Sequence, residues 1–180
     1  MNYDFLKDVT NPRHMVVAIR YLGVKEIPGL GRSNPAIILW AKNLGLTDIY
    51  KDDDQAWCAL YYADCMFEAG RQIVLPGKDK YDYIRALKYR DAANMQAVKK
   101  GDEQFGDTLI FKRDLGGHIG FYVAEDEKCF HVLGGNQGNS VKVARLEKSR
   151  LVHASRPRYT NFVPDKMWVA ADGSISQNEA

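Results

Sequence analysis

Cysteine is scarce in this sequence, and its few cysteines have no paired spacing. The three thiols, Cys58, Cys65 and Cys129, form neither a CxxC motif nor another spacing of paired metal ligands, so the sequence predicts no disulfide framework. Long apolar runs are also missing, because none approaches the ~20 residues that cross a membrane. Residues 1–20 lack the basic patch and apolar stretch of a secretion signal. We expect a soluble chain that stays in the cytoplasm in which it is made, with no membrane insertion.

A large excess of charge of either sign is missing as well. The chain has 25 Lys and Arg against 23 Asp and Glu, a net charge of +2. This charge is too small to indicate nucleic-acid binding, and it is compatible with approach to an acidic polymer. The 180 residues, 46% hydrophobic and 27% charged, are typical of one globular domain. We place that domain at residues 1–160 and expect a partly disordered extension over residues 161–180, whose polar end has too few apolar residues to pack.

Helical signals fill the first half of the chain. Two Asn-Pro pairs each place a capping side chain before a proline at the first position of a helix, and a glycine follows where each helix should end. Apolar and small residues also recur at helical spacing farther along. The predicted helices run from Pro12 to Gly23, from Pro35 to Gly45, from Trp57 to Gly70 and over residues 81–98.

The second half of the chain has the pattern of strands. From residue 107 onward, short runs of β-branched and aromatic residues alternate with Gly, Asp and Asn, which is typical of an antiparallel sheet. These runs cover residues 107–113, 118–125, 128–135, 140–146 and 150–158. Helices followed by strands predict an α+β domain in which the third helix packs on one face of the sheet.

Cys58 is the candidate nucleophile. A cysteine attacks as its thiolate, and a helix N-terminus and a nearby imidazolium both lower the pKa of a thiol. The predicted helix places Cys58 in its first turn, and Gln55, just before it, can offer an amide donor to an oxyanion. Cys65 and Cys129, inside a helix and a strand, are interpreted as small buried hydrophobic residues. From residue type alone, that interpretation stays open for Cys58 too.

The candidate base and its partner lie in the strand region. His118 opens a strand after two glycines and shares a strand face with Gly120, so its small neighbours leave room for the end of a helix to approach. Asn136 follows a strand in a glycine-rich loop, where its side-chain carbonyl can accept from the imidazole and fix its tautomer. By residue type alone, Asn136 is more typical of a turn.

Metal sites are only weakly indicated. Cys129 and His131 share a strand face and His153 lies on another strand, but no second ligand pair stands at a zinc spacing. The acidic run at 52–54 offers oxygen ligands for calcium, yet adjacent acids are more typical of a solvated helix start. We therefore predict no metal and no cofactor.

Four motifs occur in the order in which a known family carries them. They are WC at 57–58, GDTLIF at 106–111, GHIGFY at 117–122 and VLGGNQGNSV at 132–141. With them the chain resembles CHAP-type peptidoglycan hydrolases, papain-like enzymes related to the NlpC type, over residues 16–159. It is closer to phage and prophage members, which it also resembles at 22–29, 33–37 and 156–157.

The resemblance implies a papain-like fold and a cysteine amidase or endopeptidase that cleaves an amide of bacterial peptidoglycan. The site residues it implies are Cys58 as nucleophile, His118 as base and Asn136 as their third member. Beside them we expect Gln55, Trp57 and Gln137 at oxyanion or substrate-binding positions. In the implied mechanism the thiolate attacks an amide carbonyl, and the backbone N–H of Cys58 and Gln55 hold the oxyanion. His118 then protonates the leaving amine and activates water. The implied protein is a monomeric endolysin that waits in the host cytoplasm until it is released to the cell wall.

One position departs from the family pattern. Many CHAP enzymes carry a glutamate two residues before the asparagine, where this chain has Gly134, so a carboxylate contribution is absent or comes from elsewhere. Residues 71–104 match poorly and are expected to wall the cleft and shape substrate choice. The alternatives are an interbacterial amidase effector, a virion-associated lysin, and a catalytically inactive wall-binding or structural module.

Overall fold

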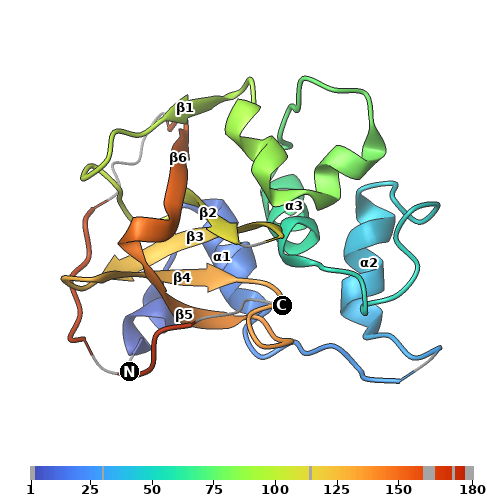
Figure 1. The fold of residues 1–180 in the computed structure, drawn as a ribbon, viewed down its shortest axis with the longest axis horizontal. Coiled ribbons are helices and arrows are strands. Elements are labelled where there is room, and N and C mark those ends of the chain that lie inside the picture. The colour runs from blue at the N-terminus through green and yellow to red at the C-terminus, as the bar shows by residue number, and fades with distance from the viewer. Residues whose placement is uncertain (1–2, 30, 114, 160–164, 172, 177–180) are drawn as a thin grey trace.

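The protein folds as short helices packed against one antiparallel sheet (Figure 1). The structure is a computed structural model, which describes residues 3–29, 31–113, 115–159, 165–171 and 173–176. Its α-helices are α1 (Arg13–Arg20), α2 (Pro35–Asn43) and α3 (Cys58–Glu68). Short 3₁₀ helices are η1 (Asp4–Asp8), η2 (Lys80–Ile84), η3 (Ala86–Asp91) and η4 (Lys148–Arg150). The α+β class predicted from the sequence is confirmed.

The sheet has six strands in the order β1-β6-β2-β3-β4-β5, and every neighbouring pair is antiparallel. The strands are β1 (Met95–Ala97), β2 (Thr108–Arg113), β3 (Gly116–Glu125), β4 (Cys129–Gly134), β5 (Lys142–Glu147) and β6 (Leu151–Pro157). Strands β2 to β6 correspond to the five predicted runs. The pairing of β3 with β4 reaches Phe121 and Leu133 and goes no farther toward the start of β3.

The helix caps follow the prediction at one Asn-Pro pair and differ at the other. Asn34 caps α2, since its side-chain oxygen accepts from the backbone N–H of Ala36 at 2.9 Å. Helix α1 begins one residue later than expected, with Pro12 itself at the cap position and no side-chain cap bond, so Asn11 does not cap it. Helix α3 begins at Cys58, as predicted to within a residue.

The helix predicted over residues 81–98 is wrong. This part of the chain forms η2 and η3, separated by an extended Arg85 with φ −116° and ψ 103°, and then strand β1. Strand β1 pairs with β6 in the register Met95 to Pro157. The edge of β6 offers backbone hydrogen bonds that the apolar spacing of the segment does not reveal, and this distant pairing outweighs local helical preference.

Two apolar clusters lie on the two faces of the sheet. One contains the buried side chains of α1, α2 and α3 and, from the sheet, Ile110, Ile119, Phe121, Val123 and Leu133. The other consists of Leu109, Phe111, Tyr122, Phe130, Val132, Ala144, Leu146 and Ala154. Helix α3 therefore packs on the face of β3 that carries Ile119, whereas the expectation placed the helix end on the His118 face.

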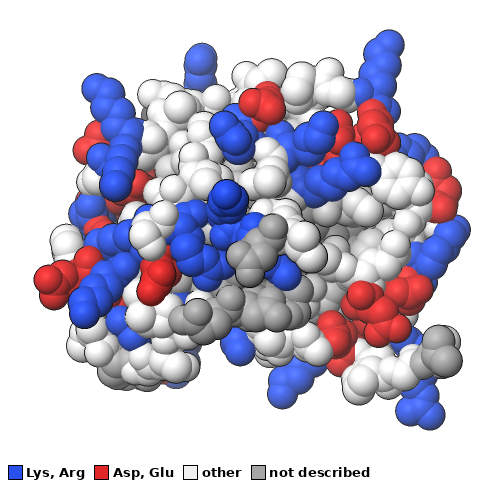
Figure 2. All heavy atoms as spheres, in the orientation of Figure 1, with Lys and Arg blue, Asp and Glu red and all other residues white. Residues whose placement is uncertain are grey.

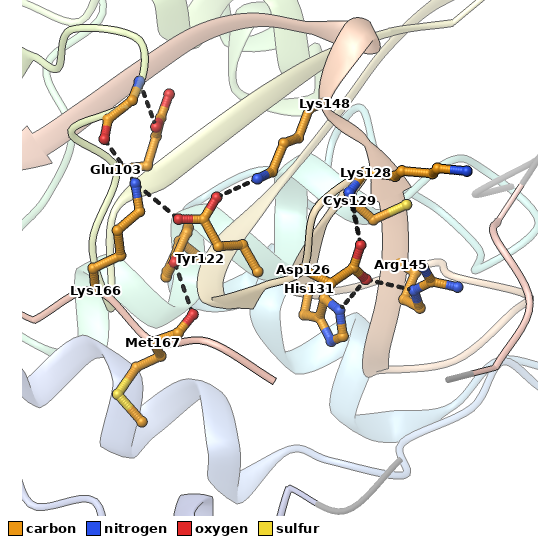
Figure 3. A network of polar contacts seen from close by, with 12 residues as sticks. Glu103, Tyr122, Asp126, Lys128, Cys129, His131, Arg145, Lys148, Lys166 and Met167 are labelled. Carbon is orange, nitrogen blue, oxygen red and sulfur yellow. Dashed lines mark hydrogen bonds and ion pairs between the residues drawn. The ribbon is translucent and has the colours of Figure 1, made fainter. Parts of the chain in front are cut away.

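The chain after residue 164 lies along the sheet where the structure describes it. The backbone N–H of Glu125 donates to Met167, and the N–H of Val169 donates back to Glu125. The buried carboxylate of Glu125 forms ion pairs with Lys148 at 2.6 Å and Lys166 at 2.8 Å (Figure 3). Residues 173–176 also bond to the sheet, because Ser176 donates to the Arg145 carbonyl at 2.9 Å. The remaining positions of the extension, 161–164, 172 and 177–180, lie outside the described residues.

Candidate active site

Cys58 is the first residue of α3, and its thiol is buried with 4% of the residue exposed. Burial raises the pKa of Cys58, while the nearby backbone N–H groups of Ile119 and Ala59 and the charge of Arg113 act in the opposite direction. The net direction is upward, so the resting thiol keeps its proton at neutral pH. A nucleophilic Cys58 therefore needs a base that takes this proton.

The effect of the Ile119 backbone N–H on the pKa of Cys58 places the sulfur near the start of β3. The N–H groups of a strand lie in the plane of its sheet and point to a strand edge. Strand β2 pairs with β3 on one side through Ile119 and His118, whereas β4 pairs with β3 only as far as Phe121. Cys58 therefore lies near the start of β3, where β4 no longer pairs with it, and it belongs to the apolar cluster on the Ile119 face of the sheet.

His118 is fully buried and its ring is held by Gln137. The Nε2 atom of His118 lies 3.1 Å from Oε1 of Gln137. Because an amide oxygen only accepts hydrogen bonds, Nε2 carries the proton, and Nδ1 is the basic nitrogen of the neutral ring. The amide nitrogen of Gln137 lies 3.0 Å from the carbonyl of Val132 and 2.5 Å from that of Lys142, which fixes the orientation of the amide. Gln137 therefore sets the tautomer of His118.

Gly134 makes room for this pair. A Cβ atom at position 134 would lie 3.0 Å from Nε2 of His118 and 3.1 Å from Cδ of Gln137. The space that a larger residue would need at 134 is thus occupied by the imidazole and by Gln137. Where the CHAP pattern has a glutamate at this position, this chain has Gly134, and the space is filled by the His118 ring and its hydrogen-bond partner Gln137.

Asn136 does not have the position predicted for it. The hydrogen-bond partner of the His118 ring is Gln137 instead. Oδ1 of Asn136, although buried, has no hydrogen-bond partner among the residues that the structure describes. The backbone at Asn136 has φ 56°, a left-handed conformation that Asn tolerates better than most residues. This turn directs the next side chain, Gln137, toward the histidine. Asn136 acts as the turn residue that its type alone favoured.

Gln55 and Trp57 are also placed differently from their predicted roles. The Gln55 oxygen accepts from the N–H of Lys51 at 2.9 Å, and its nitrogen is 3.5 Å from the carbonyl of Ile49, so both ends of the amide are used within their own loop. Trp57 is fully buried against Trp40, with ring centroids 5.8 Å apart. Neither side chain is displayed beside the thiol for a substrate.

The connector between α1 and α2 forms a wall of the site, which sequence reasoning from residue types missed. Its segment 23–26 is bonded to the turn after Gln137, through the pairs Gly23 to Val141, Val141 to Val24 and Glu26 to Asn139. In Figure 1 the blue connector and the orange turn run side by side. The Glu26 carboxylate also accepts from Nε1 of Trp57 at 3.3 Å. Connector, turn and start of α3 therefore form one continuous rim.

Asp53 holds the same connector. Its Oδ2 accepts from the backbone N–H groups of Ile27 at 3.1 Å and Asn34 at 2.7 Å, and the residue is buried. Asp53, the middle acid of the run at 52–54, thus uses its carboxylate to bind backbone N–H groups. Across the described parts of the chain, no group of three or more His, Cys, Asp or Glu side chains is arranged to hold a metal ion.

A second buried histidine, His131 on β4, belongs to a different network (Figure 3). Its Nε2 donates to Asp126 at 2.8 Å, and Arg145 donates to the same carboxylate oxygen at 2.8 Å. The hydroxyl of Tyr3 is 2.7 Å from Nδ1 of His131. Burial alone would raise the pKa of Asp126, but the hydrogen bonds from Arg145, His131 and two backbone N–H groups lower it overall. The network fastens residue 3 to the sheet, and it uses the histidine that the zinc alternative required.

Comparisons of the chain with models of protein families, with curated proteins and with solved structures find no match. None of the helices in the described ranges is long and apolar enough to cross a membrane. A functional proposal therefore depends on the chemistry of the site and on the motif resemblance.

Proposed function

We propose that this chain is a thiol hydrolase that cleaves an amide bond of bacterial peptidoglycan, with Cys58 as nucleophile, His118 as base and Gln137 as positioning residue. One observation carries the proposal. The thiol at the start of α3 lies close enough to the backbone N–H of Ile119, the residue that follows His118, for that group to act on its pKa, and the His118 ring is held by Gln137. A thiol, an oriented imidazole and a polar residue that sets its tautomer are the components of cysteine hydrolases.

The proposed reaction begins with proton transfer from the Cys58 thiol to Nδ1 of His118. The sulfur forms a bond to the amide carbonyl carbon, and the backbone N–H of Cys58, at the helix N-terminus, stabilises the oxyanion. The C–N bond then breaks as the imidazolium gives its proton to the leaving amine. His118 next takes a proton from water, the hydroxide attacks the thioester, and the acid is released as Cys58 regains its proton. Because the resting pKa of Cys58 is raised, proton transfer and attack are coupled.

The substrate class is supported by the motif resemblance. The WC motif lies at the start of α3, and GHIGFY covers residues 117–122 of β3. VLGGNQGNSV covers the end of β4 and the turn with Gln137. These motifs surround one site, as they would in a CHAP-type, papain-like enzyme. The small net charge of +2 is compatible with approach to an acidic polymer: Figure 2 shows Lys and Arg side chains spread over the face drawn, with Asp and Glu side chains among them and gathered most closely at the lower right. The setting we propose is phage-type cell lysis.

The test is the digestion of purified cell walls by wild-type protein and four variants, Cys58→Ala, His118→Ala, Gln137→Ala and Asn136→Ala. We expect Cys58→Ala and His118→Ala to release no fragments, Gln137→Ala to be strongly impaired, and Asn136→Ala to stay active. Mass spectrometry of the fragments from the wild type identifies the bond that is cut, whether the sugar-to-peptide amide or a peptide bond of the stem or cross-link. Full lysis by Cys58→Ala would contradict the proposal.

A wall-binding module without catalysis is the second candidate. The observation that favours it is the burial of the Cys58 thiol, which raises its pKa. Alkylation of the folded protein by iodoacetamide across pH separates the two candidates. A thiol that reacts at neutral pH and loses this reactivity in His118→Ala supports the hydrolase. A thiol that is inert below pH 9, in a protein that binds walls and releases nothing, supports the module.

A further inference from the structure

A groove of about 640 Å³ opens beside the turn that holds His118. Its lining comes from the connector after α1 and from the turn before β5, namely Leu22, Gly23, Lys25, Glu26, Pro28, Gly138, Asn139, Ser140, Val141 and Lys142. This volume is within the range of small-molecule and peptide sites, ~300–1,000 Å³. The groove is thus large enough for a few residues of an extended peptide.

The groove is connected to the candidate active site through hydrogen bonds of the turn. The backbone N–H of Gln137 donates to Ser140 at 3.0 Å, and the Ser140 hydroxyl donates back to Gln137 at 3.2 Å. The amide of Gln137 reaches the carbonyl of Lys142 at 2.5 Å. The residue that orients His118 is therefore bonded to two residues of the groove. A ligand in the groove therefore contacts residues that are bonded to Gln137, the partner of His118.

Two lysines give the groove its charge. Lys25 on the connector and Lys142 at the start of β5 are exposed, and neither forms an ion pair with a described residue. Gly138 leaves room for one of them, because a Cβ atom there would lie 2.9 Å from the Lys142 ammonium. The acid of the groove, Glu26, accepts a hydrogen bond from Trp57 and keeps its negative charge, so the two lysines leave the lining with a net positive charge. Both ammonium groups are therefore accessible to a ligand in the groove.

The rest of the lining is small or apolar. Leu22, Pro28 and Val141 contribute aliphatic surface, and Leu22 is 41% exposed. Such a surface suits short aliphatic side chains, whereas it offers no aromatic platform of the kind on which nucleic-acid bases stack. Aliphatic walls with two ammonium groups match a peptide that carries carboxylates and small side chains.

We propose that this groove is a substrate subsite that binds a free carboxylate of the peptide portion of the substrate through Lys25 and Lys142. The proposal rests on the proposed function, since it assumes that a peptide-bearing polymer is the substrate. The groove is rigidly attached to Gln137, so a carboxylate bound there places the scissile amide at the start of β3 where Cys58 and His118 lie. Lys25 and Lys142 thereby select substrates by their charge.

The test uses the full-length Cys58→Ala protein, so that binding is measured without turnover. The probes are a synthetic tripeptide, alanyl-isoglutamyl-lysine, and the same peptide with its glutamyl carboxylate amidated. We expect tighter binding of the free-carboxylate form by calorimetry, and about a tenfold loss of that preference in the Lys25→Gln/Lys142→Gln double variant. Lys100→Gln, an exposed lysine outside the groove, is the matched control and should behave as the parent protein. Equal binding of the two peptides overturns the subsite.

A second measurement keeps the subsite separate from the proposed function. Wild-type protein and the double lysine variant, each with an intact Cys58, are compared on walls with free and with amidated glutamyl groups. Wall cleavage that is unaffected by amidation and by the lysines leaves the hydrolase standing and overturns the subsite. Carboxylate-dependent binding without any wall cleavage by the wild type supports the subsite and overturns the hydrolase. Tighter binding of glycerol phosphate than of the tripeptide also overturns the subsite, because it assigns the lysines to a phosphate polymer.

Discussion

His118 and His131 are both fully buried on neighbouring strands, yet their ring partners differ in charge. His118 bonds to the neutral amide of Gln137, and His131 bonds to the carboxylate of Asp126, which Arg145 also contacts. A carboxylate partner stabilises a charged imidazolium, whereas an amide orients the ring without supplying an opposite charge. The first histidine is held so that its charge can change during a reaction. The second shares the Asp126 carboxylate with the guanidinium of Arg145, in a network of hydrogen bonds that fastens the sheet.

Replacing each of the two histidines by glutamine gives the largest expected effects and separates the role of His118 from that of His131. His118→Gln removes the proposed base, and we expect kcat for wall cleavage to fall at least ~100-fold with little change in stability. His131→Gln removes one hydrogen bond to the buried Asp126 carboxylate, and we expect the free energy of unfolding to fall by about 2 kcal/mol with kcat unchanged. Urea unfolding and wall-cleavage kinetics measure the two effects. Equal loss of activity in both variants would remove the distinction.

The partner of His118 gives the next largest effect. Gln137→Ala frees the imidazole, and we expect a ~10–100-fold decrease in kcat. Gln137→Glu puts a carboxylate where His131 has one, so the pKa of His118 should rise and the acidic limb of the kcat/KM profile should move up by about one pH unit. Asn136→Ala is the neighbouring control. An unchanged pH profile in Gln137→Glu would mean that residue 137 does not act on the ring.

Gly134 tests the packing of the same site. Gly134→Ala brings a Cβ atom to 3.0 Å from Nε2 of His118, and we expect a loss of ~1–3 kcal/mol in stability and a lower kcat. The double variant Gly134→Ala/Gln137→Ala removes one of the two crowded groups. Its stability loss should be smaller than the sum of the single losses. Simple additivity would show that residues 134 and 137 do not share space.

The smallest expected effect concerns two buried carboxyl groups, Asp126 and Asp64, whose pKa values are shifted in opposite directions. Asp126 has cationic partners and a lowered pKa, so its contribution to stability is present above the unfolded pKa near ~4 and is lost in acid. Asp64 on α3 has the amide of Asn43 as its hydrogen-bond donor, and burial, with the charge of Glu68 adding to it, raises its pKa to about 7. Its contribution is therefore present at low pH and is lost as pH rises through about 7.

We expect Asp64→Asn to raise the melting temperature at pH 8 by roughly 2–4 °C, because the uncharged amide needs no proton to stay buried. Near pH 4 the variant and the wild type should melt alike, since Asp64 is then protonated. Calorimetric melting at pH 4, 6 and 8 provides the measurement. An equal shift at all three pH values would show that ionisation of Asp64 is not the cause.

The fold was predictable where its signals are local. The Asn34-Pro35 start of α2, the beginning of α3 and the five strand runs come from caps and from the alternation of side chains. Residues 95–97 were not predictable, because their strand depends on the edge of β6, about 60 residues farther along the chain. Local spacing in that segment suggests a helix, and a distant hydrogen-bonding partner decides otherwise.

The candidate site was predictable in its residue types and not in its pairing. Cys58 and His118 were identified by a helix start and a strand start, which are local features. The choice between Asn136 and Gln137 depends on the left-handed turn at Asn136, which turns the next side chain toward the ring. Gly134 was the available signal for this pairing in the sequence. A residue without Cβ leaves space for other groups, and here the His118 ring and Gln137 fill it.

The attachment of the connector to the turn at 139–141 has a consequence for the timing of activity during synthesis. Gly23 and Val141 bond to each other although more than a hundred residues separate them, and Gln137 reaches His118 only after β4 has formed. A ribosome must therefore deliver most of the domain before Cys58, His118 and the rim can meet. Incomplete or truncated chains lack the assembled site, so any activity of the site would belong to finished, folded molecules.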